Sequence, residues 1–416
     1  MTMNETATSY VKLVLAVGQH DADYVDAFYG PPEWRQEAEA RKQPLPEIRR
    51  EAEALITAIG TQQPAAGGTD AELLRLRHVY LTRQLQSVVA RIDLLAGKKM
   101  SFDEESKALY DAVAPTHGES HFQAILDQLE TVIPGDGPLV DRLDRFKRGF
   151  VIRPDRLAPV FDAAIAECRR RTGEHITLPP GESFTVEYVT GKPWSAYNWY
   201  KGGYHSLIQV NTELPIFIDR AIDLACHEGY PGHHVYNALL EQHLVKERGW
   251  PELSIYALFS PQSLIAEGTA NFGIEVAFPG PERVAFEQKV LFPLAGLDPA
   301  VAARYYQVQE LVQKLSYAGN EAARRYLDGK IDREQAVDWL MRYSLSTRDR
   351  SEQRVRFIER YRSYVINYNL GQDLVKDYVE KSGGTADHPD RRWRVFTDLI
   401  SSPRLPSGLT PPGAAP

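Results

Sequence analysis

Residues 223–242 combine histidine and glutamate side chains in a pattern that suits a metal ion. The run DLACHEGYPGHHVYNALLEQ places His227, Glu228, His233 and His234 within eight positions. Neutral imidazoles and carboxylates bind zinc, and a site with three protein ligands keeps a fourth position open for water. A glutamate beside a histidine ligand is placed to take a proton from that water. The segment therefore predicts a Zn2+ centre with Glu228 as general base.

The third ligand is expected on the following helix. Ser260 and Pro261 are typical of a helix start. Glu267, Asn271 and Glu275 then recur every fourth residue, so they share one face of that helix. The surrounding residues are mostly apolar, and an unpaired carboxylate among them would be costly unless a metal ion were bound to it. We therefore expect Glu267 to be a ligand, whereas Asn271 and Glu275 either hold the ligands in place or satisfy local polar groups.

The spacing of the histidines leaves the second ligand open between two residues. The fourth position after His227 is Pro231, which cannot bind metal and which disturbs a helix. In a straight helix, His234 returns to within about 20° of His227 but lies about 10.5 Å further along the axis. If residues 230–232 bulge out, which Gly232 would permit, His233 takes the place of the second ligand. We favour His233, with His234 as the alternative ligand or as a donor to the substrate.

Two sequence runs resemble known families. HEGYPGHH, followed by EGTANFGIE, resembles a bacterial domain-of-unknown-function family marked by H-E-x-x-P-G-H-H and a later E-G-x-A, which is similar to the gluzincin metallopeptidases. With two residues removed, the first run also resembles the H-E-x-G-H-x-hydrophobic-Tyr stretch of the thermostable carboxypeptidases. The resemblance spans about Leu207–Val276, with a weaker echo around Leu315–Gly319. The first 180 residues match nothing of use, so no substrate class follows from it.

The resemblance implies a set of roles for the site residues. His227, His233 and Glu267 would be the metal ligands, and Glu228 would be the base. It also implies a gluzincin-like fold with a deep active-site cleft.

Helices are expected to position these residues over most of the chain. Apolar residues at helical spacing predict helices at 48–59, 71–95, 121–132 and 157–171, and Ser101 with Glu104 forms a capping-box pattern at the start of a helix over 101–112. Helices are expected again over 216–246 and 261–277. Residues 183–189 and 207–212 alternate like strands, and 197–205 is expected to be an aromatic turn between them. The predicted fold is therefore a mainly α body with a small β-sheet lining a deep cleft.

This pattern divides the chain into three regions. We expect an N-terminal helical region over 1–180, a catalytic metal-binding region over 181–400 and a mobile tail over 401–416, which is rich in Pro, Gly and Ser. Leu207–Thr212 either lies along the cleft as an edge strand that pairs with an extended peptide or is an ordinary sheet strand.

Composition excludes several classes of protein. With 48 basic and 56 acidic residues among 416, the net charge is −8, which disfavours binding to nucleic acid or to anionic membranes. Two cysteines, Cys168 and Cys226, are too few for a disulfide framework. The N-terminal residues lack a signal-peptide pattern, and no apolar run is long enough to span a bilayer, so a cytoplasmic location is expected.

Amide hydrolysis also requires a group that stabilises the oxyanion. Tyr317 is our first candidate for this role; the alternatives are Tyr364, Tyr368, Tyr204 and His205. For binding a substrate carboxylate, the candidates are Arg356, Arg360 and Arg362.

We therefore expect a zinc-dependent hydrolase that cleaves peptide bonds and acts on a peptide or small amide substrate. The sequence leaves two alternatives, a zinc hydrolase of non-peptide amides or esters and a non-catalytic helical binding protein with a structural metal site. Its oligomeric state does not follow from the sequence.

Overall fold

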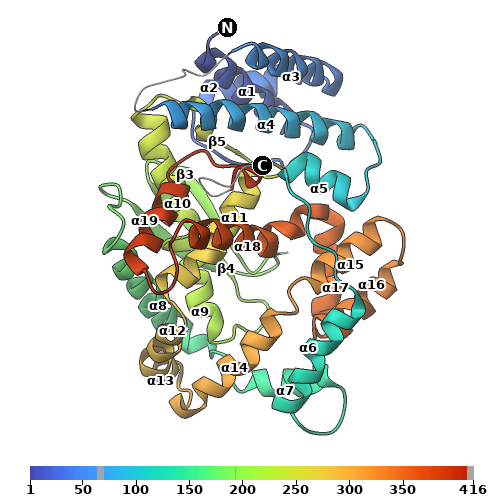
Figure 1. Ribbon diagram of the computed structural model, residues 1–416, viewed down its shortest axis with the longest axis vertical. Coiled ribbons are helices and arrows are strands. Elements are labelled where there is room, and N and C mark those ends of the chain that lie inside the picture. Colours follow the sequence, from blue (N-terminus) through green and yellow to red (C-terminus); the bar gives the residue numbers. More distant parts are fainter. Residues whose placement is uncertain (63–69, 193, 410–416) are drawn as a thin grey trace.

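Helices make up most of the computed structural model, which describes residues 1–62, 70–192 and 194–409 (Figure 1). The prediction of a mainly α protein with a small sheet is confirmed. The helices before the sheet are α1 (Met3–Val17), α2 (Pro32–Arg41), α3 (Leu45–Gly60), α4 (Ala71–Leu95), α5 (Phe102–Tyr110), α6 (Glu119–Val132), α7 (Leu139–Arg148) and α8 (Leu157–Gly173).

The helices after the sheet carry the remaining chain. They are α9 (Asp219–Leu224), α10 (His233–Leu240), α11 (Pro261–Ala277), α12 (Pro281–Phe286), α13 (Phe292–Ala295), α14 (Ala302–Gln313), α15 (Ala318–Leu327), α16 (Arg333–Tyr343), α17 (Arg348–Tyr361), α18 (Ile366–Lys381) and α19 (Pro389–Ile400).

Local sequence signals place several of these helices correctly. The helix predicted over 71–95 is α4, and Leu81, Leu85 and Val88 from its apolar stripe are fully buried. At the start of α5, the Ser101 hydroxyl accepts a hydrogen bond from the backbone N–H of Glu104, and the Glu104 carboxylate accepts one from the N–H of Ser101. The capping box predicted from Ser-x-x-Glu is therefore present.

The three-stranded sheet differs from the sequence prediction in two respects. Its order is β2 (Ser183–Val189), β4 (His205–Asn211) and β3 (Ala196–Gly202), with β2 parallel and β3 antiparallel to β4. The segment expected as an aromatic turn is therefore mostly strand β3, and the turn is confined to Gly203 and Tyr204. The strand expected at the edge is central, so its backbone already pairs on both sides and offers no edge to a peptide.

A second, two-stranded sheet was not anticipated from the sequence. It joins β1 (Val25–Phe28) to β5 (Ile255–Ala257) in antiparallel register. These strands are short, and the chain between them is more than 200 residues long, so no local turn signal announces their pairing.

The buried core does not divide at residue 180. One large cluster of buried apolar side chains includes residues of α1, α3, α4 and α8 together with residues of α10, α11, α18 and α19. A smaller cluster lies around Phe122, Leu340 and Trp339, where α6, α7 and α14–α17 meet. The N-terminal helices therefore pack directly against the helices that carry the predicted site.

Helices α11 and α18 cross in close contact at the centre of the molecule (Figure 1). The contact is made at Gly268 and Gly371, where a Cβ atom on Gly268 would overlap the backbone of Gly371. A Cβ on Gly371 would lie 2.7 Å from the carbonyl oxygen of Leu264. Two glycines thus allow the backbones to touch, and this brings the side chains on either side of the crossing together.

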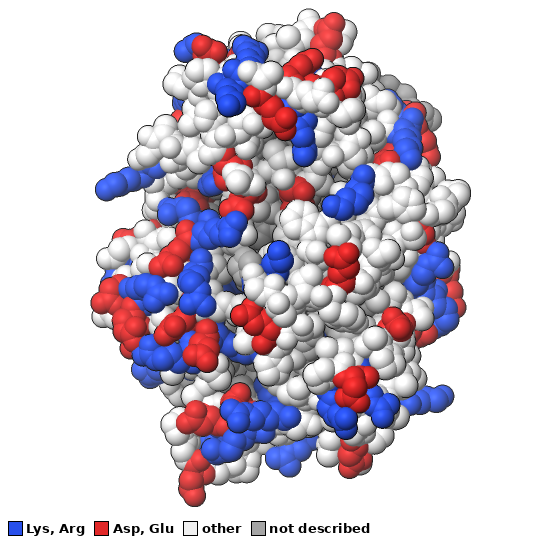
Figure 2. All heavy atoms as spheres, turned by 180° about the vertical axis from the view of Figure 1, so that it is seen from behind, with Lys and Arg blue, Asp and Glu red and all other residues white. Residues whose placement is uncertain are grey.

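The C-terminal segment is partly ordered. Leu405 and Leu409 are buried in the large core cluster, so the prediction of a mobile tail does not hold for 401–409, whereas 410–416 lie outside the described residues. Among the helices of the described ranges, none is long and apolar enough to cross a membrane. Acidic and basic side chains are interspersed over the face drawn in Figure 2.

Candidate metal centre

The helix predicted over 216–246 is interrupted in the middle. After α9 the chain forms a π-helical turn over Ala225–Gly229, and a regular helix resumes only at His233. The N–H of Gly232 donates to the carbonyl oxygen of Cys226 at 2.9 Å, and a Cβ atom on Gly232 would overlap the carbonyl oxygen of His227. Only glycine fits this position. The bulge considered from the sequence is therefore present, and it draws His233 back toward His227.

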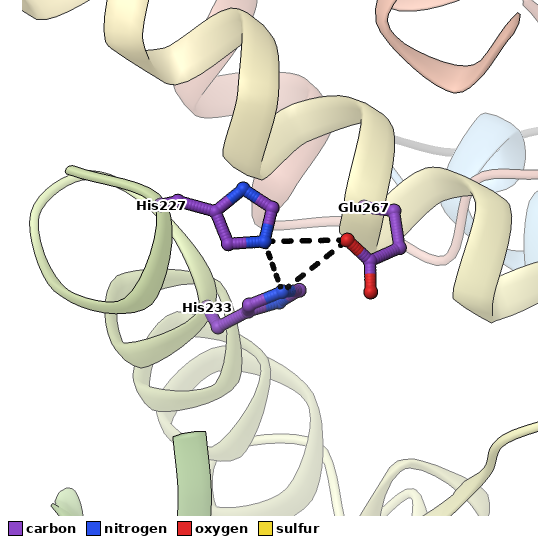
Figure 3. A group of neighbouring side chains, drawn as sticks. All are labelled: His227, His233 and Glu267. Atoms are coloured by element: carbon purple, nitrogen blue, oxygen red, sulfur yellow. Dashed lines mark hydrogen bonds and ion pairs between the residues drawn. The ribbon is translucent and has the colours of Figure 1, made fainter. Parts of the chain in front are cut away.

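Three of the predicted ligand residues meet at one point (Figure 3). The Nε2 atoms of His227 and His233 lie 3.1 Å apart. Glu267, from α11, places its Oε2 atom 3.2 Å from Nε2 of His227 and 3.8 Å from Nε2 of His233. Within the described ranges, this is the group of His, Cys, Asp and Glu residues whose ligand atoms all lie close enough to share an ion.

The separations of these atoms fit a tetrahedral zinc ion. Ligand atoms at about 2.0–2.1 Å from a tetrahedral centre are about 3.3 Å from one another. The Oε2 atom of Glu267 is buried and, among the described residues, receives no hydrogen bond, although two imidazole nitrogens face it. A buried carboxylate is costly unless a cation compensates its charge, and at this position either a metal ion or a protonated imidazole can do so.

Neighbouring side chains orient the three ligand residues. Nδ1 of His227 lies 2.8 Å from the side-chain oxygen of Asn271, whose amide nitrogen donates to the backbone carbonyl of Tyr368. The hydroxyl of Tyr364 donates to Oε1 of Glu267 at 2.8 Å. Such contacts fix which atom of a ligand residue faces the metal. Of the two roles considered for Asn271, orientation of a ligand is the one that the geometry supports.

Charges within the cluster stabilise an ion pair in the absence of metal. Burial alone lowers the pKa of His227, but contact with Glu267 and the negative charges of Glu228 and Glu267 together raise it to about 9. Burial raises the pKa of Glu267, and the two histidines outweigh this effect and hold it well below its ordinary value. The metal-free site therefore contains a protonated His227 beside an ionised Glu267 at neutral pH.

His234, the alternative ligand, lies outside this group. Its Nε2 is 2.9 Å from Oε2 of Glu182, and its Nδ1 is 2.9 Å from the hydroxyl of Ser206. Glu182 also accepts a hydrogen bond from the hydroxyl of Tyr230 at 2.6 Å. Because both ring nitrogens are engaged in a buried network, the structure assigns His234 to packing between α10 and the sheet.

Several other candidates are also placed away from the three ligand residues. Tyr317 donates to Asp373 at 2.6 Å on the surface, so its proposed role as oxyanion stabiliser is not supported by its position. His205, which is exposed at the start of β4, pairs with the hydroxyl of Ser183 on β2. Glu275 binds Lys376 at 2.8 Å.

The arginines predicted to bind a carboxylate have other environments. Arg360 pairs with Asp23 and Arg362 pairs with Glu105, both at 2.6 Å, and Arg356 is exposed.

The three ligand residues line a large cavity of about 1250 Å³, together with Glu228, Tyr364 and Tyr368. Tyr197 and Asn198 of β3 and Asn211 at the end of β4 form part of its wall.

The sequence analysis did not single out Asp26. It also lines the cavity and bonds the hydroxyl of Tyr197. Burial, with the charges of Glu267 and Glu228, raises the pKa of Asp26 to about 8.

Comparison with solved structures identifies a protein with a similar fold. The chain is similar to a candidate lipoprotein from Colwellia psychrerythraea, with a TM-score of 0.52 and 14% identity over 90% of this chain and 70% of that one. It also aligns with a candidate lipoprotein of unknown function from Shewanella oneidensis, with a TM-score of 0.44 and 13% identity over 89% and 79% of the two chains. Neither a family model nor a curated protein matches the sequence.

These comparisons overturn the prediction of a zinc-dependent peptidase. The Colwellia psychrerythraea chain, whose fold is similar, is described as a candidate lipoprotein and not as a peptidase. We therefore set peptide cleavage aside and consider the site for what its geometry supports, the binding of a metal ion.

Proposed function

We propose that the protein binds a divalent transition-metal ion, Zn2+, through His227, His233 and Glu267. The observation that carries the proposal is the mutual approach of two Nε2 atoms and one carboxylate oxygen to 3.1, 3.2 and 3.8 Å. Two imidazoles and one carboxylate form a donor set that suits zinc.

The proposed role is to present the metal ion to a ligand in the cavity. When bound, the ion would supply an open coordination position for water or for a donor atom of that ligand. Asn271 and Tyr364 would hold His227 and Glu267 in the orientation that binding requires. Glu228 lines the same cavity and is placed to accept a proton from a group bound there.

The metal content of purified protein tests the proposal directly. We expect about one zinc ion per chain in the wild type and little in His227→Ala and Glu267→Gln. A site with three protein ligands loses most of its affinity for the metal when one ligand is removed. Glu275→Gln is the matched control, because Glu275 lies two turns further along α11 and pairs with Lys376. Wild type that stays metal-free after dialysis against zinc would contradict the proposal, and so would a full complement of zinc in Glu267→Gln.

Removal of the metal is expected to leave the fold intact. Helices α11 and α18 are held by direct backbone contact and by buried apolar side chains on both sides of the site. Chelation should therefore remove zinc without loss of the helical circular-dichroism signal. An unfolded chelated protein would instead indicate that the ion has a structural role.

A further inference from the structure

A second charged feature of the cavity lies on α17. Arg354 lines the cavity, and its guanidinium lies over the ring of Phe357 at 4.9 Å and over that of Tyr368 at 5.9 Å. In the described part of the chain, no carboxylate lies within 4 Å of this group, and no hydrogen-bond acceptor contacts it. Arg354 is half-buried, and burial lowers the pKa of its guanidinium. The side chain nevertheless stays charged at any ordinary pH.

Other arginines of the cavity wall have carboxylate partners. Arg220 pairs with Asp223 at 3.1 Å, and Arg283 pairs with Asp223 at 2.8 Å and with Glu287 at 2.9 Å. Their charges are therefore compensated within the protein.

Arg350 resembles Arg354 instead. It lines the cavity one helical turn earlier and contacts the carbonyl of Pro215 at 3.5 Å and the ring of Phe217; among the described residues no carboxylate lies within 4 Å of it. Residues four apart share one face of a helix, so α17 presents two uncompensated cations to one cavity.

Tyr368 connects Arg354 to the metal-binding residues. The ring of Tyr368 lies beneath Arg354, and the backbone carbonyl of Tyr368 accepts the hydrogen bond from Asn271 that also fixes His227. The Tyr368 hydroxyl is close enough to Glu267, Glu228 and Arg354 for all three charges to act on its pKa, which burial raises well above the ordinary value. Arg354 and the three metal-binding residues therefore line one cavity, with Tyr368 between them.

We propose that Arg354, supported by Arg350, binds the anionic group of a small-molecule ligand, a carboxylate or a phosphate, inside this cavity. This inference extends the proposed function. It rests on that function only in assuming that the other end of the same ligand contacts the bound metal ion. A planar guanidinium forms two parallel hydrogen bonds to either oxyanion. An arginine that is already desolvated and unpaired gains more from such a partner than one that must first leave an internal carboxylate. The cavity, at about 1250 Å³, has room for a small-molecule ligand.

The test uses anion binding to the full chain after removal of metal by chelation, so that zinc does not contribute. Inorganic phosphate and succinate are titrated separately at constant ionic strength, with chloride as the reference, and binding is followed by calorimetry and by the rise in Tm. The variants are Arg354→Met, which keeps the length of the side chain without its charge, and Arg356→Met. Arg356 lies on the same helix but is exposed, so it is the matched control.

We expect wild type and Arg356→Met to bind at least one of the two anions, and Arg354→Met to bind it at least tenfold more weakly. Without anion, Arg354→Met should be as stable as wild type or more stable, because it removes an uncompensated charge. A purely structural arginine would lower Tm when replaced. If Arg354→Met does not fold, Arg354→Lys replaces it and should bind more weakly than wild type while keeping part of the affinity.

Each result has a defined meaning. Equal binding in wild type and Arg354→Met overturns the proposal, and so does wild type that binds neither anion. Preference for phosphate or for succinate identifies which oxyanion the ligand carries. Zinc content is measured on separate samples, so loss of the metal proposal and loss of the anion site are distinguishable.

Discussion

Zinc binding should compete with a proton at His227. In the metal-free site, the pKa of His227 is raised to about 9 by Glu267 and Glu228, against about 6.5 for an unperturbed histidine. Metal binds only the neutral imidazole. At pH 7 the site must therefore release about one proton for each zinc ion bound.

The size of the effect follows from the two pKa values. Only sites in which His227 is neutral can bind zinc, so the apparent affinity for zinc is proportional to the neutral fraction of His227. With a pKa of about 9, that fraction and the apparent affinity should rise about 30-fold between about pH 6.5 and about pH 8. A histidine with an unperturbed pKa would give a rise of only about twofold over the same interval. The difference is far larger than the error of a competition assay.

The assay is competition with a chromophoric chelator of known pH dependence, together with calorimetry in buffers of different ionisation enthalpy. Glu228→Gln is the informative variant, because it removes one of the charges that hold the proton on His227. We expect it to keep the metal and to show a shallower pH dependence. A rise below about threefold in wild type, or the same slope in both proteins, would refute this reasoning.

The same proton affects stability in the opposite direction to metal affinity. Because the pKa of His227 is higher in the folded chain than about 6.5, its contribution is fully present at low pH and is lost as pH rises from about 6.5 through 9. The free energy of unfolding of the metal-free protein should fall over that interval by at most about 3 kcal/mol.

Two further predictions concern the elements around the site. Gly268→Ala should lower the free energy of unfolding by about 1–3 kcal/mol, because a Cβ atom would overlap the backbone of Gly371. Gly173→Ala is the control, since a Cβ atom there meets no atom within 4 Å. Equal midpoints of urea unfolding for the two variants would contradict the packing argument. Tyr364→Phe should weaken zinc binding about tenfold, since it removes the donor that orients Glu267, and unchanged competition with a chelator would exclude this role.

Local signals in the sequence were sufficient for most helices. Regular apolar spacing defines α4, and the pair Ser101 and Glu104 defines the start of α5, because both features depend only on residues within a few turns. The strands were harder to predict. β2 was assigned correctly, but the central position of β4 depends on which strands pair, and pairing is decided by the whole sheet rather than by the strand itself.

The candidate site could also be predicted in part. His227, Glu228 and Glu267 were found from residue type and helical spacing, and Gly232 indicated the bulge that favours His233. Arg354 was not singled out, although its spacing of four from Arg350 is visible in the sequence. Many surface helices have such a spacing, and only the cavity distinguishes this pair from solvated arginines.

What the sequence determined by itself is the set of donor groups and the helices that carry them, since residue type and periodicity are local properties. The tertiary structure decided which donors meet. The glycine contact between α11 and α18 sets the position of Glu267 relative to Tyr368. Because Gly232 has no Cβ atom, the chain can turn tightly there, and this turn places His233, rather than His234, beside His227. His234 differs from His233 by one position, yet a rotation of about 100° along the helix directs it to Glu182 instead. Distances between side chains on different elements depend on how the backbones pack, and no local pattern encodes them.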